Sequence, residues 1–363
     1  MNLDECMEIP KLPDSLRSEE EIIATWKGNI SKPLVSLRCI TYNHAPYIED
    51  AIKGFLIQET EFPIEVLIHD DASTDGTREI IENYQKKYPK IIKTILQNVN
   101  QYSQGVKPGS FMDPLCSGEY YAVCEGDDYW HYENKLNLQV MMLESHDNLD
   151  LCIHSAFMHD YYTGRDSVIG QYGKTNGLID LVDIVSKTHG QVPTASTLIR
   201  ASAHKELKEF TKKHPELVVG DIYLHFFGAK RGGAYYIDSP MSVYRLNTEG
   251  SFGDRYKKSS ELRFKHVSSR VASYLALEEV DRVDSHVSKA LRASSVNILY
   301  SFLKNPGNTY VNRMKILNSY GFLLTAKKKM VLYPVTYIPL LLNIFHPVVK
   351  SLKKFSRSFY SSL

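Results

Sequence analysis

Residues 64–77 read IEVLIHDDASTDGT. The apolar run Ile64–Ile68 has the length and composition of a buried strand, and a polar cluster follows it directly. A helix is predicted from Arg78 to about Tyr88, where Pro89 ends it because proline cannot continue a helix. This stretch therefore predicts a buried strand that leads through a polar loop into a helix.

The same arrangement occurs on both sides of this stretch. Before it, a strand is predicted at 34–40 (LVSLRCI) and a helix at 47–58. After it, strands are predicted at 91–96 and 120–124, with a short helix near 111–117 between them. Strands that alternate with helices at this spacing predict βαβ units and a parallel sheet.

Polar clusters follow three of the predicted strands, at Thr41–His44, Asp70–Asp75 and Glu125–Asp128. The carboxyl ends of parallel strands share one edge of a sheet, and ligands bind outside that edge. We therefore expect the three clusters to meet and form an active site. The polar stretch 98–108 is predicted to be a mobile loop.

The pattern is less regular after residue 145. The predicted strands are 150–154, 195–199 and 234–237, and the predicted helices are 135–144, 180–186, 201–210 and 220–229. From Ser259 to about Leu324 the pattern is helical throughout, with a break near Pro306-Gly307. This part predicts a small α-helical appendage.

Asp127 and Asp128 close an apolar strand beneath the aromatic residues Tyr129 and Trp130. Two adjacent carboxylates are costly to place together unless a cation accompanies them. Mg²⁺ and Mn²⁺ favour carboxylate oxygens together with substrate phosphates. The pair therefore predicts a divalent metal site, and the alternative is a solvated turn, which Gly-Asp-Asp also suits.

The second cluster, Asp70–Asp75, predicts one residue that contacts a ligand and the start of a helix. Asp71 is the residue that we expect to contact a ligand, as an acceptor for a base N–H of a nucleotide. Ser73, Thr74 and Asp75 are expected to cap the helix that begins near Thr77. His44, His69 and His131 lie near the predicted edge but lack metal-ligand spacing, so we expect ordinary polar packing for them.

Three segments in this order resemble a known family. Val35–His44 (VSLRCITYNH), Ile68–Thr77 (IHDDASTDGT) and Glu125–Trp130 (EGDDYW) are similar to the motifs of family 2 glycosyltransferases of the GT-A fold. The resemblance is strong over 34–145 and weaker to about 255. It implies a mixed, mostly parallel Rossmann-like α/β sheet flanked by helices, and an enzyme that uses a nucleotide diphosphosugar.

The resemblance also implies roles for individual residues. Thr41, Tyr42 and Asn43 hold the nucleoside, and Asp71 binds the base. Asp128 ligates Mn²⁺ or Mg²⁺, and Asp127 is shared between the metal and the ribose.

Two later residues complete the implied site. Asp221 resembles the catalytic base that takes the proton from the acceptor hydroxyl. The alternative is an aspartate that only stabilises the N-terminus of a helix through the helix dipole. Arg245 resembles a group that helps to hold the diphosphate, with a surface arginine as the alternative. Glu125 stands where many relatives have aspartate, which leaves its role open. The chain lacks Gln-x-x-Arg-Trp, the mark of processive synthases, so the transfer of a single sugar is expected. The resemblance implies that this transfer inverts the anomeric centre.

Composition adds information about compartment and surface. The five cysteines form no CxxC, and the first twenty residues do not resemble a signal peptide, so we expect a reducing, cytoplasmic location. Residues 285–363 carry 12 Lys or Arg and no Asp or Glu. Within them, 20 uncharged residues between Lys329 and Lys350 are interrupted by three prolines. This tail predicts attachment to an anionic membrane surface, on the inner face, with packing on the protein or a membrane span as alternatives.

The sequence therefore predicts four parts: a lead-in at 1–32, a glycosyltransferase domain at 33–255, a helical appendage at 256–326 and the tail at 327–363. The predicted enzyme moves one sugar from a nucleotide diphosphosugar, with a UDP-sugar as the expected donor, to a glycan or lipid-linked acceptor, as in bacterial surface polysaccharide synthesis. A nucleotidyltransferase and a non-catalytic glycan-binding or scaffold protein are the alternatives. No nucleic-acid motif is present, so nucleic acid is not an expected partner.

Overall fold

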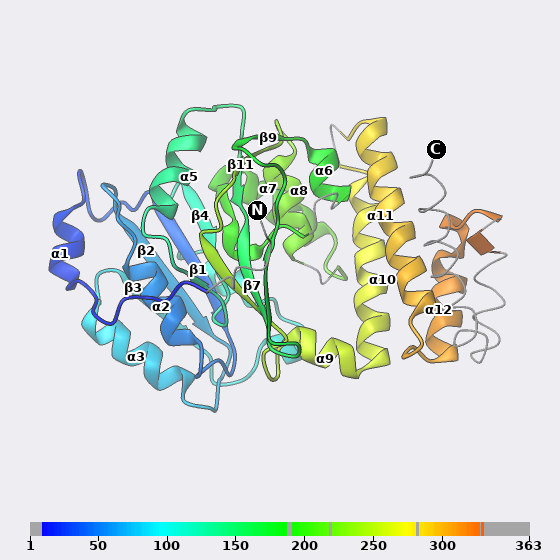
Figure 1. The fold of residues 1–363 in the computed structure, drawn as a ribbon, viewed down its shortest axis with the longest axis horizontal. Coiled ribbons are helices and arrows are strands. Elements are labelled where there is room, and N and C mark those ends of the chain that lie inside the picture. Colours follow the sequence, from blue (N-terminus) through cyan, green and yellow to red (C-terminus); the bar gives the residue numbers. More distant parts are fainter. Residues whose placement is uncertain (1–8, 187–190, 218–219, 281–282, 327, 330–363) are drawn as a thin grey trace, which may run out of the picture. The chain divides into compact units, whose positions relative to one another are not determined.

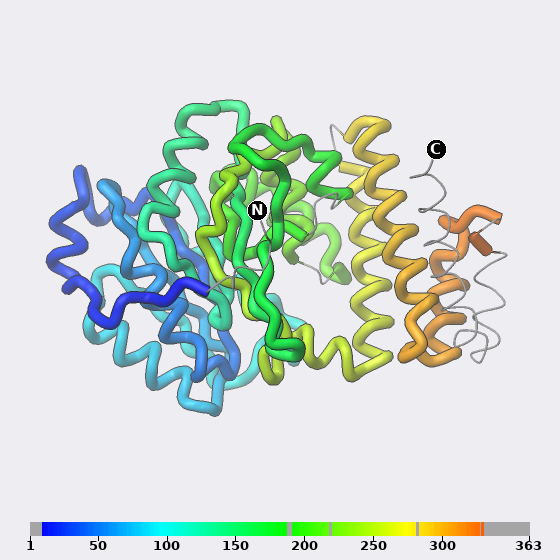
Figure 2. Tube along the Cα trace, in the orientation of Figure 1, coloured from blue at the N-terminus to red at the C-terminus, as the bar shows by residue number. Residues whose placement is uncertain are grey.

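The computed structural model describes residues 9–186, 191–217, 220–280, 283–326 and 328–329. The chain divides into two compact units, which Figures 1 and 2 trace in sequence colours. The first unit comprises Met1–Lys213 and Gly220–Ser251, and the second comprises His214–Val219 and Phe252–Leu363. All of the predicted site residues belong to the first unit.

An eight-stranded sheet forms the centre of the first unit, in the order β3-β2-β1-β4-β10-β6-β11-β9. Pairing is parallel from β3 to β4 and between β6 and β11, whereas β10 and β9 run antiparallel to their neighbours. This confirms the predicted mixed, mostly parallel α/β sheet. The strands are β1 Val35–Thr41, β2 Ile64–Asp70, β3 Ile92–Leu96, β4 Tyr120–Val123, β6 Leu151–His154, β9 Gly177–Ile179, β10 Leu198–Arg200 and β11 Ala234–Ile237.

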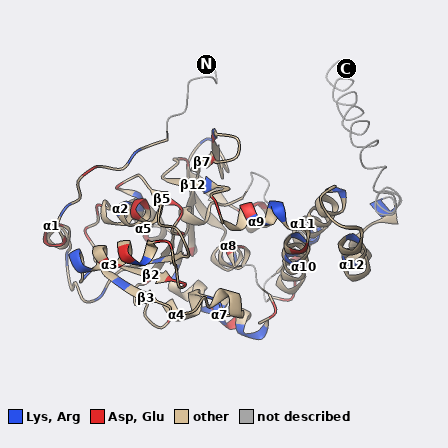
Figure 3. Cartoon of the chain, turned by 90° about the horizontal axis from the view of Figure 1, so that it is seen from below, with Lys and Arg blue, Asp and Glu red and all other residues tan. Residues whose placement is uncertain are grey.

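Helices cover both faces of this sheet. Figure 3 shows α2 and α5 on one side of β2 and β3, and α4 and α7 on the other. On the first side, Leu37 of β1 belongs to the same buried apolar core as Ile52 and Phe55 of α2 and Leu136 of α5. The helices are α1 Glu19–Ala24, α2 Ile48–Leu56, α3 Thr77–Lys87, α4 Gly109–Met112, α5 Lys135–Glu144, α6 Leu181–Ser186, α7 Ala201–Lys213 and α8 Asp221–Ala229.

A second, four-stranded sheet has the order β5-β12-β7-β8. Its strands are β5 Tyr129–Trp130, β7 Ala156–Asp160, β8 Arg165–Ile169 and β12 Ser242–Leu246. β7 and β8 form an antiparallel hairpin, and β12 lies parallel to β7, with Leu246 opposite Asp160. The sequence did not predict this sheet, because its strands are two to five residues long and pair with distant segments.

Two element predictions are wrong in detail. The segment 195–199 divides into a 3₁₀ turn, Thr194–Ser196, and the strand β10. The reason is that side chains occupy its carbonyl groups: Trp130 Nε1 donates to Ala195 O at 2.8 Å and Gln139 Nε2 to Ser196 O at 2.7 Å. The helix predicted near 111–117 is α4, which ends at Met112; further along, Ser117 N and Ser117 Oγ donate to the buried carboxylate of Glu65.

From Phe252 onward, the described part of the second unit consists mainly of helices. It contains α9 Phe252–Lys258, α10 Ser260–Leu277, α11 Ser285–Lys304, α12 Tyr310–Tyr320 and the 3₁₀ turn Gly321–Leu323. The predicted break at Pro306-Gly307 separates α11 from α12, and a further break separates α10 from α11, where Asp284 caps the new helix. The predicted division at 255 falls within α9, and the division of the chain into domains stays a prediction.

Within the described residues, no helix combines the length and the apolar character that crossing a membrane requires. The predicted basic and apolar tail, 327–363, lies outside the described residues except for Lys328 and Lys329.

Candidate active site

The first and third polar clusters meet at the carboxyl ends of β1 and β4. Thr41 pairs with Asp70 across β1 and β2, and Gly126 N donates to Ile40 O at 3.0 Å. A Cβ atom at Gly126 would stand 2.6 Å from Thr41 Oγ1, so only glycine permits this close approach. Thr41 Oγ1 is itself buried and has no hydrogen-bond partner within the described part of the chain.

The second cluster is held by hydrogen bonds to the first. Asn43 adopts a left-handed conformation, with φ 54°. Its backbone N–H donates to Ser73 Oγ at 2.8 Å, and its side-chain Oδ1 accepts from Thr74 N at 2.9 Å. Ser73 and Thr74 therefore connect the two loops and do not cap α3, which corrects that prediction; Asp75 does accept from the backbone N–H of Thr77, at 3.1 Å.

Asp71 is buried at the end of β2 and holds the following loop. One oxygen of its carboxylate accepts from Gln101 N at 2.8 Å and the other from Tyr102 N at 3.1 Å. The predicted loop 98–108 contains a 3₁₀ turn, Tyr102–Gln104, at this point. A role of Asp71 in binding a base stays a prediction. Tyr42, another predicted nucleoside contact, is 45% exposed beside this cluster.

The paired aspartates are held by the end of β12. Asp128 Oδ1 accepts from Arg245 N at 2.9 Å, whereas Asp128 Oδ2 is buried without a partner in the described residues. Arg245 Nη1 donates to Asp127 O at 3.1 Å, and Thr248 Oγ1 donates to Asp127 Oδ2 at 3.4 Å. Arg245 also pairs with Asp50 of α2 and lies over the rings of Tyr47 and Tyr129. The predicted partners Asp127, Asp128 and Arg245 are therefore adjacent.

Mutual repulsion marks this group of carboxylates. Burial, with the neighbouring Asp127 and Glu125, raises the pKa of Asp128 well above its usual range. Glu125 is exposed by its accessible surface, yet protein atoms surround its carboxyl group closely. The loss of water around this carboxyl group, together with the charges of Asp127 and Asp221, raises the pKa of Glu125 to about 8. We call Glu125, Asp127, Asp128 and Asp221 the acidic cluster. Its four carboxyl groups, together with burial, also raise the pKa of Tyr244.

Asp221 is the first residue of α8, after Gly220 at the N-cap. Gln191 Nε2 donates to Asp221 Oδ2 at 3.5 Å. Its charge contributes to the raised pKa of Glu125, so Asp221 lies within electrostatic reach of Glu125, although the two residues are distant in the sequence. The helix position also suits an aspartate on electrostatic grounds, so its role as a base stays a prediction.

The residues present fit a divalent cation. Asp128 Oδ2 is a buried carboxylate oxygen that has no partner among the residues the structure describes, and Asp127 is its neighbour in the chain. A cation would relieve the repulsion that raises the pKa of Asp128. Among the described residues, no group of three or more His, Cys, Asp or Glu has metal-binding geometry. Mg²⁺ and Mn²⁺ are commonly held by one or two carboxylates together with substrate phosphates, and such a site needs no complete protein cage.

The histidines near the edge behave differently from one another. His69 stacks on Phe111 and contacts Gln97, and His131 contacts Pro240 O, which is the polar packing that the sequence predicts. His44 Nε2, however, lies 3.9 Å from Asp127 Oδ2, so it belongs to the surroundings of the cluster. The roles of Thr248 and Asp50 were missed, because each contacts a residue more than a hundred positions away in the sequence.

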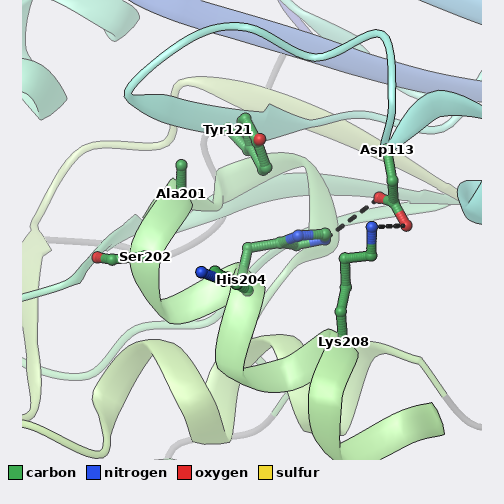
Figure 4. A pocket seen from close by; sticks show the side chains of 7 residues that line it. Asp113, Tyr121, Ala201, Ser202, His204 and Lys208 are labelled. Carbon is green, nitrogen blue, oxygen red and sulfur yellow. Dashed lines mark ion pairs between the residues drawn. The ribbon is translucent and has the colours of Figure 1, made fainter.

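A hollow of about 350 Å³ lies apart from these residues, beside α4 and α7 (Figure 4). Asp113 lines it and pairs with Arg38 at 2.7 Å and Lys208 at 3.1 Å. His204 Nε2 accepts from Arg38 Nη1, and burial with the Arg38 charge lowers the pKa of His204 to about 3. None of the predicted site residues lines this hollow, and Asp113 pairs there with Arg38 and Lys208, so we assign it to the packing of α4 and α7.

Comparisons with known proteins place the chain in a family. The family model described as Glycosyl transferase family 2 matches residues 36–207. An uncharacterised protein of Mycobacterium tuberculosis is 31% identical over 280 residues, which are 75% of this chain and 76% of that protein. The dTDP-rhamnosyl transferase RfbG of Shigella flexneri is 26% identical over 297 residues, which are 77% of this chain and 99% of that protein.

The fold has a solved counterpart. The structure of S. aureus TarS 1-349 in complex with UDP-GlcNAc aligns with a TM-score of 0.62 at 17% identity, and the alignment covers 85% of this chain and 88% of that one. This likeness shows the fold, and the sequence matches carry the relationship. The chain belongs to glycosyl transferase family 2 and is a glycosyltransferase with the GT-A fold.

Proposed function

We propose that this chain is a metal-dependent, inverting glycosyltransferase that moves one sugar from a nucleotide diphosphosugar to a hydroxyl group of a glycan or lipid-linked acceptor. The observation that carries the proposal is the acidic cluster, in which a buried oxygen of Asp128 finds no partner within the described part of the chain and lies next to Asp127. A buried carboxylate next to a second like charge destabilises the free protein, so this arrangement is suited to a bound cation.

The donor is proposed to lie across the ends of β1, β2 and β4. Thr41, Tyr42 and Asn43 would hold the nucleoside, and Asp71 would accept from the base. Uracil and thymine share an N3–H between two carbonyl groups, and RfbG is described as using a dTDP-sugar, whereas TarS was solved with UDP-GlcNAc. We therefore propose a UDP- or dTDP-sugar as the donor.

Asp128 and Asp127 are proposed to hold Mn²⁺ or Mg²⁺, which would neutralise the charge that develops on the diphosphate leaving group. Arg245, which is held by Asp50 and by Asp127 O, would add a positive charge beside the diphosphate leaving group. Asp221 takes the proton from the acceptor hydroxyl group while the oxygen of that hydroxyl group forms a bond to the anomeric carbon. The bond from that carbon to the diphosphate oxygen breaks on the opposite side, and the nucleoside diphosphate departs.

A bacterial surface polysaccharide pathway is the proposed setting, because the named relative RfbG transfers rhamnose and its match covers nearly all of its length. The acceptor would then be a growing glycan or its lipid-linked precursor. A cytoplasmic location, peripheral to the inner membrane face, follows from the basic tail and is also part of the proposal.

Thermal unfolding with a panel of nucleotide sugars tests the donor and the metal together. A ligand that binds the native state at a hundred times its Kd stabilises it by about 2.7 kcal/mol. We expect UDP- or dTDP-sugars to raise the Tm in the presence of Mn²⁺, and GDP-sugars to have little effect. Asp128→Asn should abolish the Mn²⁺-dependent part, whereas the exposed control Asp147→Asn should retain it. Absence of any shift with all of these sugars would contradict the proposed donor.

A further inference from the structure

A row of aromatic rings leads away from the acidic cluster. His44 Nε2 lies 3.9 Å from Asp127 Oδ2, and the His44 ring is 6.5 Å from that of Tyr47. The ring of Tyr47 is 6.0 Å from that of Tyr161, which is 4.8 Å from that of His159. We call these four residues the aromatic row. It joins the turn before α2 to the β7–β8 hairpin, two parts of the chain that are far apart in sequence.

The hairpin that carries the outer end of the row is firmly held. The carboxylate of Asp160 accepts from Tyr162 N at 3.0 Å, from Thr163 Oγ1 at 2.9 Å and from Asn247 Nδ2 at 2.7 Å. Tyr161 N donates to Leu246 O at 3.0 Å. Thr248, two residues further along, donates to Asp127. The position of the hairpin tip is therefore coupled to that of the paired aspartates through the end of β12.

The rings of the row have fixed orientations, and the row is open to solvent at Tyr161, whereas its other three residues are partly buried. Tyr161 is 45% exposed, and its neighbour Tyr162 is 50% exposed. The Tyr47 and His159 rings lie at 80° and 89° to the ring of Tyr161. Arg245 of β12 lies over the ring of Tyr47. Exposed aromatic surface with a polar rim is characteristic of binding sites, and rigid aromatic rings supply contact area at low entropic cost.

The chemistry of the rim indicates the class of ligand. His159 Nδ1 contacts Asp166 at 2.6 Å, and Asp160 stands at the hairpin turn, so hydrogen-bonding groups border the exposed rings. A lipid chain on this surface would desolvate those groups without replacing their hydrogen bonds. A sugar ring has one apolar face of C–H groups and a rim of hydroxyl groups, which matches tyrosine faces bordered by polar side chains.

We propose that the aromatic row, with Tyr162, is the subsite that binds a sugar ring of the acceptor glycan, one or more units from the hydroxyl group that reacts. The proposal rests on the proposed glycosyltransfer at the acidic cluster, from which the row starts. Tyr161 is then a specificity residue that selects a glycan acceptor and not a lipid alone.

Saturation-transfer NMR on the full chain tests the subsite directly. The probes are cellobiose, N,N′-diacetylchitobiose and a rhamnose disaccharide, with octyl phosphate as the lipid-chain probe. We expect at least one disaccharide to receive saturation from the wild-type protein. The double substitution Tyr161→Ala/Tyr162→Ala should weaken its binding about tenfold, because it removes two stacking rings. Tyr161→Phe keeps the ring and should bind nearly as the wild type does.

Tyr310→Ala is the matched control, since Tyr310 is 44% exposed on α12 and outside the row. The Tm shift with the donor and Mn²⁺ is measured on every variant and should not change, which also verifies folding. Disaccharide binding that survives the double substitution, saturation of octyl phosphate alone, or no disaccharide signal from the wild type would each overturn the proposal. Loss of the donor shift in the wild type would instead refute the proposed function, whatever the disaccharides show.

Discussion

Glu125 stands where the resemblance left its role open, and its charge has a measurable consequence. The pKa of Glu125 in the native protein is raised to about 8, first by burial and then by Asp127 and Asp221, whereas an unfolded glutamate has a pKa of about 4.3. Between these values the unfolded chain has lost a proton that the native protein still holds. The free energy of unfolding contributed by this group therefore falls as the pH rises from about 4.5 to about 8.

We expect Glu125→Gln to remove this dependence. In metal-free buffer its Tm should exceed that of the wild type by an amount that grows between pH 5 and pH 8, because the amide carries no charge to repel its neighbours. Differential scanning calorimetry across this range measures the effect. The exposed control Glu133→Gln should differ from the wild type by a constant amount. Parallel curves for Glu125→Gln and the wild type would show that Glu125 is not electrostatically strained.

Asp221 offers a second test at the scale of one residue, since it begins α8 and its charge acts on Glu125. As a general base it should contribute about 10²- to 10⁴-fold to the rate. As a helix-terminal charge alone it should contribute about 0.3–1 kcal/mol to stability and nothing to the rate. We expect Asp221→Asn to reduce release of nucleoside diphosphate by the larger factor while the donor-induced Tm shift persists. Unchanged turnover with a small loss of stability would assign Asp221 to the helix.

At the scale of elements, the position of the paired aspartates depends on the contact between α2 and β5. A Cβ atom at Gly54 of α2 would stand 2.6 Å from Trp130 O and 2.8 Å from Trp130 N, and these backbone atoms immediately follow Asp128 and Tyr129. Trp130 itself is fully buried beneath Phe55, so β5 has little freedom to move away. A methyl group at residue 54 must therefore displace either the helix or the strand.

We expect Gly54→Ala to lower the free energy of unfolding by about 1–3 kcal/mol, the usual cost of overpacking a well-packed core. It should also weaken the Mn²⁺-dependent donor shift, since β5 carries Asp128 with it. Gly177→Ala is the matched control, because a Cβ atom there meets nothing within 4 Å. Chemical denaturation measures the first effect and thermal unfolding with donor the second. Equal stability of the two variants would mean that α2 and β5 separate without cost.

At the scale of the whole molecule, the sequence predicts the part of the fold whose signals are local. Apolar runs such as Ile64–Ile68 followed by polar clusters placed β1, β2 and β4 and brought their ends together correctly. The second sheet depends on distant pairing: Asp128 accepts from Arg245 N across 117 residues, and β12 pairs with β5 and β7, both of which lie far away in the sequence. No short-range pattern specifies such contacts, so the aromatic row and the role of Thr248 required the structure.

The tail, residues 327–363, is predicted to bind an anionic membrane surface, because its composition differs from that of the rest of the chain. Lys327–Lys329 precede 20 residues without charge, and Lys350, Lys353, Lys354 and Arg357 follow them. A basic residue near an anionic leaflet contributes about 1 kcal/mol at low salt, and this contribution declines with ionic strength. Three neutralised charges should therefore weaken binding by about a hundredfold or more.

We expect the full chain to co-sediment with vesicles that contain phosphatidylglycerol and not with pure phosphatidylcholine vesicles. The triple substitution of Lys353, Lys354 and Arg357 by Gln should abolish most of this binding, and added salt should do the same to the wild type. The triple substitution of Lys86, Lys87 and Lys90 by Gln removes the same charge from an exposed part of the first unit and should leave binding intact. If both triple variants lose binding equally, net charge and not the tail attracts the membrane; if neither does, the tail has no electrostatic role at the surface.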